Sequence, residues 1–294
     1  MSTAPTPVGR ASPRQVLIAG CGYVGTRLGE LLAARGDHPV GLRRNPSGLP
    51  PSIEPLAVDL LAGDLESRIP PADLVVYAAS ADRSDESSYR RIYVDAVDAL
   101  LRVFESREPD QRPSRLVFVS STAVYGDAEG GWVDENTSPR PESFRGSVMV
   151  EGEDRVLGSP IPGVVLRLGG IYGPGRTRII DLVRAGQARC PGDGPIWSNR
   201  IHREDAAAAT MHLLDLPEPE DVYLGVDAEP TPLCQVYRWL AEQVGAPEPP
   251  KDPAVSRDRS NKRCSSERLQ ASGFAFRYPS FRDGYGEMLE ESGP

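Results

Sequence analysis

The sequence predicts an α/β fold built on a doubly wound, mainly parallel sheet, and two observations predict it. Short apolar runs alternate with amphipathic segments through residues 14–175, as expected when crossover helices join parallel strands. The first apolar run, residues 15–19, ends in the pattern G-x-G-x-x-G and leads into a helical stretch that Gly36 stops.

The glycine turn is the shape that a dinucleotide requires. Gly20 permits a sharp turn, Gly22 lets the backbone approach a pyrophosphate, and Gly25 lets the helix pack on the strand. The N–H groups of the first helical turn then face the anion. The candidate cofactor-binding residues of this turn are Gly20, Cys21, Gly22, Tyr23, Val24 and Gly25.

The second predicted strand, residues 38–42, ends in Arg43 and Arg44. An NAD site usually has an acidic residue near this point to accept from the ribose 2′-hydroxyl, and none stands at the strand end. Because two guanidiniums suit a 2′-phosphate, we expect NADP as the cofactor rather than NAD. A solvated basic pair at a loop tip is the alternative.

The next two strands add candidates at the same edge of the sheet. The strand of residues 55–60 ends in Asp59 and Leu60, and Asp59 is a candidate acceptor for the adenine amino group. Capping the next turn is an alternative role for Asp59. The buried strand of residues 73–80 ends in small side chains that leave room for the cofactor ribose, namely Ala78, Ala79 and Ser80.

Helical spacing follows through Tyr89 and Tyr93, which we assign to core packing. A fifth strand, residues 115–120, delivers two hydroxyls at its carboxyl end, Ser121 and Thr122. Ligands bind at this end of the strands in open α/β sheets.

Composition and charge exclude several classes of protein. The formal net charge of −9 over 294 residues argues against a general nucleic-acid or membrane-surface binder, and no apolar run is long enough to span a membrane. The four cysteines are scattered without C-x-x-C spacing, so we expect no disulfide, no metal site and a cytoplasmic location. Residues 1–13 are expected to form a disordered tail.

Five motifs together resemble the extended short-chain dehydrogenases/reductases, the NAD(P)-dependent epimerase/dehydratase family. They are the glycine turn, Asp59-Leu60, S-T-A-V-Y-G at residues 121–126, Leu166-Arg167 with Y-G-P at residues 172–174, and N-R-I-H-R-E-D at residues 199–205. The resemblance covers roughly residues 14–290. It implies a Rossmann domain over residues 14–175, and a mixed region, residues 176–290, that completes the sheet and forms a small interleaved substrate lobe.

In that family the reaction depends on a Ser or Thr, a Tyr, and a Lys four residues after the Tyr. Ser121 matches the first position, but residues 141–153, where the pair belongs, contain no tyrosine and no lysine. Depending on the register, those two places hold Arg145 and Met149 or Phe144 and Val148. The chain therefore resembles an atypical subgroup of the family, to which residues 261–265 and 277–285 are also similar.

Three residues are candidates for catalysis. Ser121 is expected to position the substrate oxygen, with capping of the strand end as the alternative. Tyr125 is a replacement acid if it faces the nicotinamide, and otherwise packs within its turn. Arg145 is expected to hold an anionic substrate or an oxyanion, with a solvated helix face as the alternative.

The remaining candidates are substrate-binding groups, most of them cationic: Thr122, Arg176, Arg200, His202, Lys262 and Arg263. Together they suit an acidic substrate. A structural histidine and surface charges are the simpler interpretations.

These features predict an NADP(H)-binding oxidoreductase or epimerase/dehydratase-like enzyme. Its partner would be a small-molecule substrate, polar and either anionic or a nucleotide sugar, with no nucleic acid and no membrane. A non-catalytic NADP(H)-binding redox sensor or scaffold is the alternative, because the Tyr and Lys are missing. The family's tendency to pair helices across a dimer face leaves a homodimer open.

Overall fold

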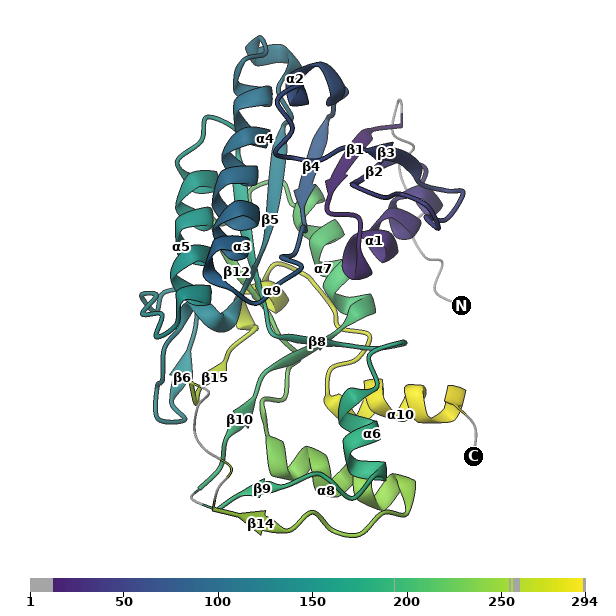
Figure 1. Cartoon of the computed structure of the whole chain (residues 1–294), viewed down its shortest axis with the longest axis vertical. Helices are drawn as coiled ribbons and strands as arrows, with labels where there is room; N and C mark the ends of the chain where they lie inside the picture. Colours follow the sequence, from purple (N-terminus) through teal and green to yellow (C-terminus); the bar gives the residue numbers. More distant parts are fainter. Residues whose placement is uncertain (1–12, 193, 254, 256–259, 293–294) are drawn as a thin grey trace, which may run out of the picture.

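A seven-stranded, wholly parallel sheet forms the centre of the computed structural model, which describes residues 13–192, 194–253, 255 and 260–292 (Figure 1). The tail expected over residues 1–13 lies, apart from Pro13, outside the described residues. Across the sheet the strands are β12 (Val222–Gly225), β7 (Gly163–Leu168), β5 (Arg115–Ser121), β4 (Leu74–Tyr77), β1 (Gln15–Ala19), β2 (His38–Arg43) and β3 (Glu54–Ala57). The predicted doubly wound Rossmann-type sheet is confirmed.

The chain reverses its direction of travel across the sheet next to β1. Leu17 pairs with Val40 of β2 on one side and with Val75 of β4 on the other. Such a switch point opens a crevice at the carboxyl ends of the strands, where ligands bind in this architecture. The edge strand β12, in which four residues pair with β7, was not predicted.

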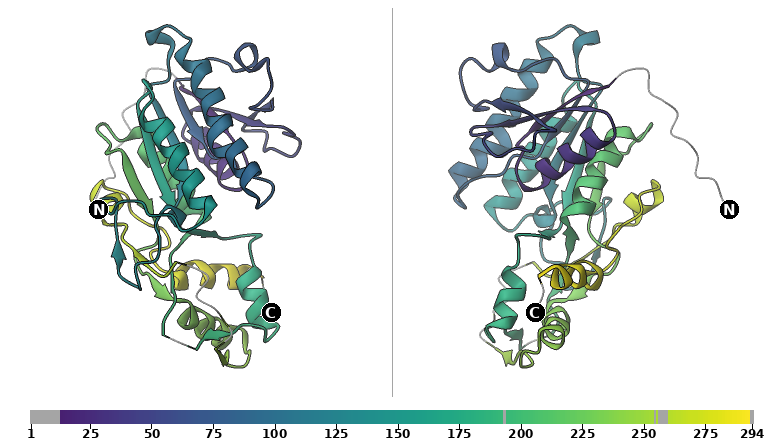
Figure 2. Two further views of the ribbon diagram at one scale, coloured as in Figure 1. Left: turned by 60° about the vertical axis from the view of Figure 1, so that its left-hand side comes forward. Right: turned by 90° about the vertical axis from the view of Figure 1, so that its right-hand side faces the viewer.

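Helices cover both faces of the sheet, and the two further views bring first one helical layer and then the other to the front (Figure 2). One face carries α1 (Tyr23–Ala34) and α7 (Arg203–Asp215), and the other carries α4 (Ala96–Glu105) and α5 (Phe144–Leu157). The central strands β1 and β4 are apolar on both sides, which explains their unbroken apolar runs in the sequence.

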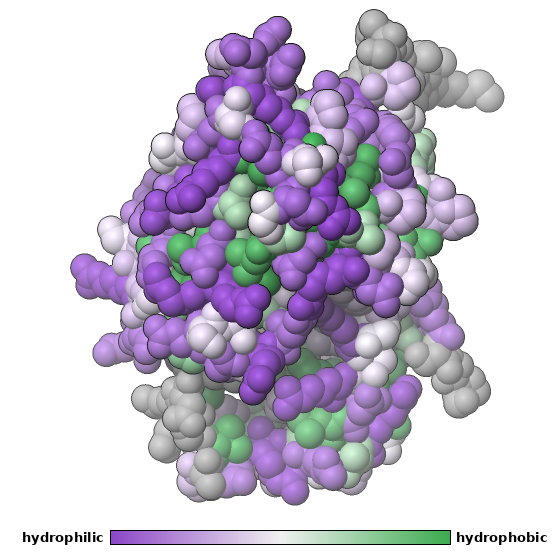
Figure 3. All heavy atoms as spheres, turned by 45° about the horizontal axis from the view of Figure 1, so that its top comes forward, coloured by the Kyte–Doolittle hydropathy of each residue, from purple (hydrophilic) through white to green (hydrophobic). Residues whose placement is uncertain are grey.

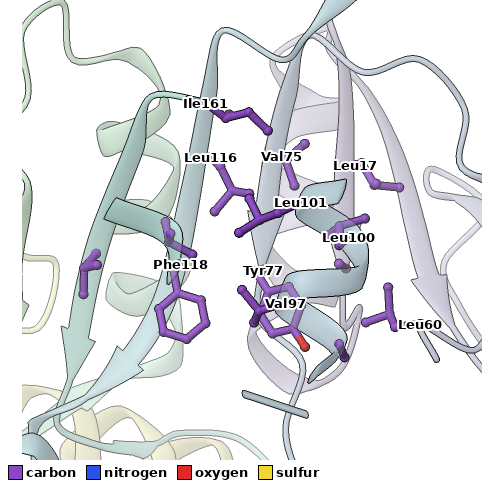
Figure 4. Close-up of a cluster of buried hydrophobic side chains, with 14 of the residues drawn as sticks. Leu17, Leu60, Val75, Tyr77, Val97, Leu100, Leu101, Leu116, Phe118 and Ile161 are labelled. Carbon is purple, nitrogen blue, oxygen red and sulfur yellow. The ribbon is translucent and has the colours of Figure 1, made fainter. Parts of the chain in front are cut away.

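The core between the sheet and α4 shows how the layers are held. Figure 4 shows the helix side chains meeting those of the strands, Val97, Leu100 and Leu101 against Leu17, Val75 and Tyr77. All six are at most 5% exposed. Burying one such leucine or valine contributes about 1.5–3 kcal/mol to the free energy of folding.

A π-helical turn interrupts the helix that the sequence predicts over residues 86–106. α3 (Glu86–Arg90) runs into η1 (Arg91–Asp95), which has π-helical geometry, and then into α4. The backbone of η1 lies so close to α5 that a Cβ on Gly152 would stand 2.3 Å from the carbonyl oxygen of Tyr93. Glycine is therefore the residue that permits this helix contact.

A smaller group of elements lies beyond the carboxyl edge of the sheet and has its own apolar cluster (Figure 1). It is formed by α6 (Arg178–Arg184), α8 (Leu233–Val244) and α10 (Phe281–Ser292). We call these three helices, together with the turn of residues 173–177 that leads into α6, the small lobe. They come from three separated stretches of the chain, so the lobe is interleaved with the sheet.

Short elements complete the described chain. The paired strands are β8 (Gly170–Tyr172) with β11 (Arg200–His202), β6 (Trp132–Val133) with β15 (Arg263–Cys264), β9 (Cys190–Pro191) with β14 (Lys251–Asp252), and β10 (Trp197–Ser198) with β13 (Thr231–Pro232). The remaining helical turns are α2 (Leu65–Arg68), η2 (Pro109–Gln111), η3 (Thr122–Val124) and α9 (Glu267–Ala271).

One expectation about the cysteines is wrong. Cys190 of β9 and Cys234 of α8 form a disulfide that ties β9 to the small lobe, whereas Cys21 and Cys264 are free and buried. The two partners are 44 residues apart, so no local spacing signals the pair. Because of this disulfide, cysteine usage no longer favours a reducing compartment.

The face drawn in Figure 3 is mostly hydrophilic, with apolar side chains in small groups. Within the described part of the chain, no helix combines the length and the apolar character that a membrane crossing needs.

Candidate cofactor and substrate cleft

A cleft of about 1520 Å³ runs along the carboxyl ends of β2, β1, β4 and β5. It begins at the glycine turn after β1, passes the ends of β2 and β4, and reaches Ser121 at the end of β5. Its other wall comes from α3, η1 and α5, and its far end meets the loop after β8. The cleft is large enough for an extended dinucleotide with room for a small substrate.

The glycine turn fits a pyrophosphate. Gly20 has a φ of +91°, and a Cβ there would lie 2.2 Å from the backbone of Ala79. A Cβ on Gly25 would stand 2.8 Å from the carbonyl oxygen of Gly20, so the helix packs tightly on the turn. A Cβ on Gly22, in contrast, has no neighbour closer than 3.9 Å and would fill open space. Backbone is therefore exposed at the position where a phosphate must approach.

The predicted cofactor-binding residues beyond the turn also line this cleft. They are Arg43, Arg44, Asp59, Leu60, Ala78, Ala79 and Ser80, and within the turn Cys21, Tyr23 and Val24 line it too. Asp59 also caps its turn, since its Oδ1 accepts from the N–H of Leu61 at 3.0 Å. The two roles proposed for Asp59 are thus compatible.

The two arginines at the end of β2, Arg43 and Arg44, make different contacts. A guanidinium N–H of Arg43 approaches the carbonyl oxygen of Cys21 at 3.5 Å. Arg44 forms an ion pair with Asp82, and both side chains are more than 60% exposed. Such an exposed pair contributes at most about 1 kcal/mol, so Arg44 is available to another anion.

At the other end of the cleft, Ser121 and Arg145 line the same space. The Oγ of Ser121 accepts from the N–H of Ala123 at 3.2 Å, which caps η3 and fixes the hydroxyl at the strand end. Of the two registers for α5, Arg145 and Met149 line the cleft, whereas Phe144 and Val148 do not. The first turns of α5 thus present a guanidinium and a thioether to the cleft.

Two aromatic residues assigned to the core line the cleft instead. Tyr89 is half-buried, with the guanidinium carbon of Arg145 5.9 Å from its ring centre and Phe144 edge-on at 5.5 Å. Tyr93 lies behind it, and burial raises its pKa to about 12. Helical spacing alone did not predict this position, because a helix face that lines a cleft and one that packs in the core have the same sequence pattern.

Tyr125 lies outside the cleft, and the role of proton donor finds no support. Its hydroxyl donates to the carbonyl oxygen of Asp134 at 2.7 Å and accepts from Arg167 at 2.7 Å. Burial raises its pKa to about 12, even though the charge of Arg167 acts in the opposite direction. The 3₁₀ turn η3 directs this side chain inward.

Arg167 belongs to a buried polar network that the sequence did not reveal. Its Nε and Nη2 donate to the carboxylate of Glu153, with a shortest distance of 2.6 Å, and both side chains are at most 5% exposed. The Oγ of Ser120 donates to the same carboxylate at 2.5 Å. The network ties the ends of β5 and β7 to α5, and so fixes Ser121 relative to Arg145.

Arg200 and His202 are buried beneath the cleft rather than in it. Arg200 is 3% exposed and lies against the rings of Phe281 and Tyr285. His202 is also 3% exposed, and its Nδ1 accepts from the N–H of Glu204. Burial lowers the pKa of His202 to about 4. Both positions agree with structural roles and not with the substrate contacts expected of them.

The expected roles of Lys262, Arg263 and Thr122 are not supported either, because none of them lines the cleft. The ammonium of Lys262 is buried and donates to the carbonyl oxygen of Tyr125 at 2.9 Å, and burial lowers its pKa. The guanidinium of Arg263 lies between two tryptophan rings, at 5.0 and 4.8 Å from their centres. Of the substrate candidates, Arg176 does line the cleft.

The charge of the cleft is opposite to that of the chain. Six arginines line it, Arg43, Arg44, Arg83, Arg91, Arg145 and Arg176, against three aspartates, Asp59, Asp82 and Asp85. The whole chain, however, has a formal net charge of −9. Positive charge concentrated in a concave site raises the local concentration of an anionic ligand.

A doubly wound sheet with a glycine turn at its switch point, and small residues and arginines along the same crevice, defines a dinucleotide-binding protein of the Rossmann class. The family model of the NAD dependent epimerase/dehydratase family matches residues 16–225. The chain belongs to this family, a group of NAD(P)-binding extended short-chain dehydrogenases/reductases.

Known proteins are similar to this chain over nearly its whole length. Protein YeeZ of Escherichia coli K12 is 31% identical over 281 residues, which cover 90% of this chain and 97% of that protein. A solved structure from Methylobacillus flagellatus with a provisional NAD-dependent epimerase/dehydratase assignment is 33% identical, with a TM-score of 0.79 and 96% and 99% coverage of the two chains. The human epimerase family protein SDR39U1 with NADPH, at 22% identity and TM-score 0.76 over 94% and 99% of the chains, shares the fold.

Proposed function

We propose that the protein is an NADP(H)-dependent oxidoreductase or epimerase/dehydratase-like enzyme that acts on a small polar, anionic substrate. One observation carries the proposal: a single cleft joins the glycine turn and Arg44 at one end to Ser121 and Arg145 at the other. The length of the cleft separates a nucleotide end from a reacting end, which is the arrangement that a nicotinamide-dependent reaction needs.

The preference for NADP rests on the end of β2. Arg43 and Arg44 line the cleft there, and Arg44 is held only by an exposed ion pair. A 2′-phosphate binds a guanidinium in a charge-assisted, often bidentate, geometry. Asp82, an acid of this part of the cleft, is already paired with Arg44.

At the reacting end, two side chains of the protein, Ser121 and Arg145, would act on the substrate. When bound, the nicotinamide would supply or accept the hydride. Ser121 would donate a hydrogen bond to the oxygen of the reacting carbon and hold that carbon in place. Arg145 would bind the negative charge of the substrate or of a developing oxyanion.

The proton must come from a group other than Tyr125, whose hydroxyl is engaged in the core. Tyr89 has the one cleft-lining phenol beside Arg145 among the described residues, and it is our candidate for this step. Water is the alternative donor. A phenol within reach of the substrate oxygen could act as a general acid.

A second function is compatible with the same α5 residues. With Arg145 and Met149 where the family has Tyr and Lys, the protein could bind NADP(H) without turnover, as a redox sensor or scaffold. The retained Ser121 at the cleft favours the enzyme.

Calorimetric titration with NADPH, NADP⁺, NADH and NAD⁺ tests the cofactor, and absorbance at the reduced-nicotinamide band tests turnover with a panel of carbonyl acids and nucleotide sugars. We expect the NADP forms to bind at least about 10-fold more tightly, and we expect substrate-dependent oxidation of NADPH. Ser121→Ala should abolish turnover and leave cofactor binding unchanged. Equal affinity for NADPH and NADH would refute the 2′-phosphate assignment.

A further inference from the structure

The turn after β8 brings one arginine of the small lobe to the nucleotide end of the cleft. Gly173, Pro174, Gly175 and Arg176 form a tight turn, in which the N–H of Arg176 donates to the carbonyl oxygen of Gly173 at 2.9 Å. Gly175 has a φ of +79°, a conformation that favours glycine. This geometry directs the chain back toward α1 before α6 begins at Arg178.

Tyr23 fixes that turn to the cofactor site. Tyr23 is the first residue of α1, directly after the glycine pair, and its hydroxyl donates to the carbonyl oxygen of Pro174 at 2.9 Å. The guanidinium of Arg176 lies over the ring of Tyr23, 4.0 Å from its centre. A guanidinium stacked on an aromatic ring is held in one orientation, so less freedom is lost when it binds an anion.

Arg176 has no acidic partner among the described residues. Its contacts there are the Tyr23 ring and one N–H donated to the carbonyl oxygen of Ile171 at 3.3 Å. The neighbouring Arg203, in contrast, is paired with Glu204. Arg176 is therefore an uncompensated charge that lines the cleft beside the first turn of α1.

The glycine turn itself contributes no cation. Its side chains between Gly20 and Gly25 are those of Cys21, Tyr23 and Val24, so the turn offers a pyrophosphate only backbone N–H groups and the helix dipole. From the side of β2, the guanidinium of Arg43 approaches the carbonyl oxygen of Cys21 at 3.5 Å. A dinucleotide pyrophosphate carries two negative charges. Arg176, which is stacked on Tyr23 and has no acidic partner among the described residues, supplies a cation from the other side of the turn.

We propose that Arg176 binds the cofactor pyrophosphate from the small lobe, in place of the substrate contact that the sequence suggested. The proposal rests on the dinucleotide binding that the family implies, and not on the choice between NADP and NAD. Because the same turn leads into α6, the bound cofactor would hold the small lobe against the Rossmann sheet.

The experiment measures dissociation constants by calorimetry for Arg176→Ala and Arg176→Lys. The ligands are NADPH, NADH, ADP-ribose and adenosine 2′-monophosphate. Arg176→Ala should weaken the three pyrophosphate ligands by the same factor, about 10- to 100-fold, and leave the monophosphate unchanged. Arg176→Lys should give an intermediate loss, since it keeps the charge but not the planar fork.

Two matched variants separate this effect from others. Arg178→Ala removes an exposed arginine two residues away that does not line the cleft, and should change nothing. Arg44→Ala should weaken NADPH and adenosine 2′-monophosphate, the two ligands with a 2′-phosphate, and leave NADH and ADP-ribose unchanged. Since Arg176 is exposed, its removal should leave the unfolding temperature unchanged.

Unchanged affinities in Arg176→Ala would overturn the proposal and return Arg176 to the substrate. A loss confined to NADPH and adenosine 2′-monophosphate would overturn it as well, because the arginine would then bind the 2′-phosphate. Failure of the wild-type protein to prefer NADPH would refute the cofactor assignment but would not affect this test.

Discussion

Replacing Glu153 by glutamine should break the buried network that holds the reacting end of the cleft. The Glu153 side chain is 2% exposed and accepts from Ser120 and from two nitrogens of Arg167, which is 5% exposed. In Glu153→Gln the guanidinium keeps its charge without a counter-charge, and an amide N–H₂ is added where only acceptors are needed. Removing one partner of a buried ion pair costs about 3–5 kcal/mol.

Urea unfolding followed by circular dichroism measures this cost. A loss of about 3–5 kcal/mol corresponds to a fall in the unfolding midpoint of about 1–2 M. The double variant Glu153→Met with Arg167→Met is the control, because it removes both charges and keeps apolar volume, and it should cost less than about 2 kcal/mol. A Glu153→Gln cost below about 1 kcal/mol, or a double variant as unstable as the single one, would refute the reasoning.

Three further predictions concern the cleft and pH. Asp82→Asn should tighten NADPH binding about 2- to 5-fold in calorimetry, because it releases Arg44 and removes a negative charge, whereas weaker NADH binding would mean that Asp82 holds the ribose. Tyr89→Phe should lower turnover at least about 10-fold with NADPH affinity unchanged, and full activity would exclude it as the proton donor. The pKa of His202 is lowered to about 4, so between about pH 6.5 and 4 the unfolded chain binds a proton that the folded chain does not, and stability falls as pH falls through that window. Over that range, the free energy of unfolding of His202→Gln, measured in urea, should fall by up to about 3 kcal/mol less than that of wild type. Parallel pH profiles of the two proteins would show that His202 does not cause the loss.

The first part of the cofactor site could be predicted because its determinants are local. A strand, a glycine turn and a helix lie within residues 15–34, and each residue type has one backbone role there. The sequence therefore located the backbone of the site and the position of Arg43 and Arg44 at a strand end. Side-chain directions were not needed for this part, because the glycine turn acts through its backbone.

The reacting end was less predictable, because side-chain direction depends on tertiary contacts. Tyr125 follows Ser121 by four residues, but the 3₁₀ turn between them sends the hydroxyl of Tyr125 to Asp134 while Ser121 stays at the cleft. Lys262 donates to the backbone of Tyr125 from 137 residues away. No local pattern records such a contact.

The π-helical turn η1 has a consequence for how this wall of the cleft could diverge among relatives. An extra residue in a helix rotates the turns on its N-terminal side by about 100° relative to those on its C-terminal side. Deleting one residue within Arg91–Asp95 would therefore turn Tyr89 away from the cleft, while Leu100 and Phe104 of α4 kept their places against the sheet. A single-codon deletion could thus remodel the substrate wall without a compensating change in the core, which makes this turn a natural site for insertions and deletions during the evolution of new specificities.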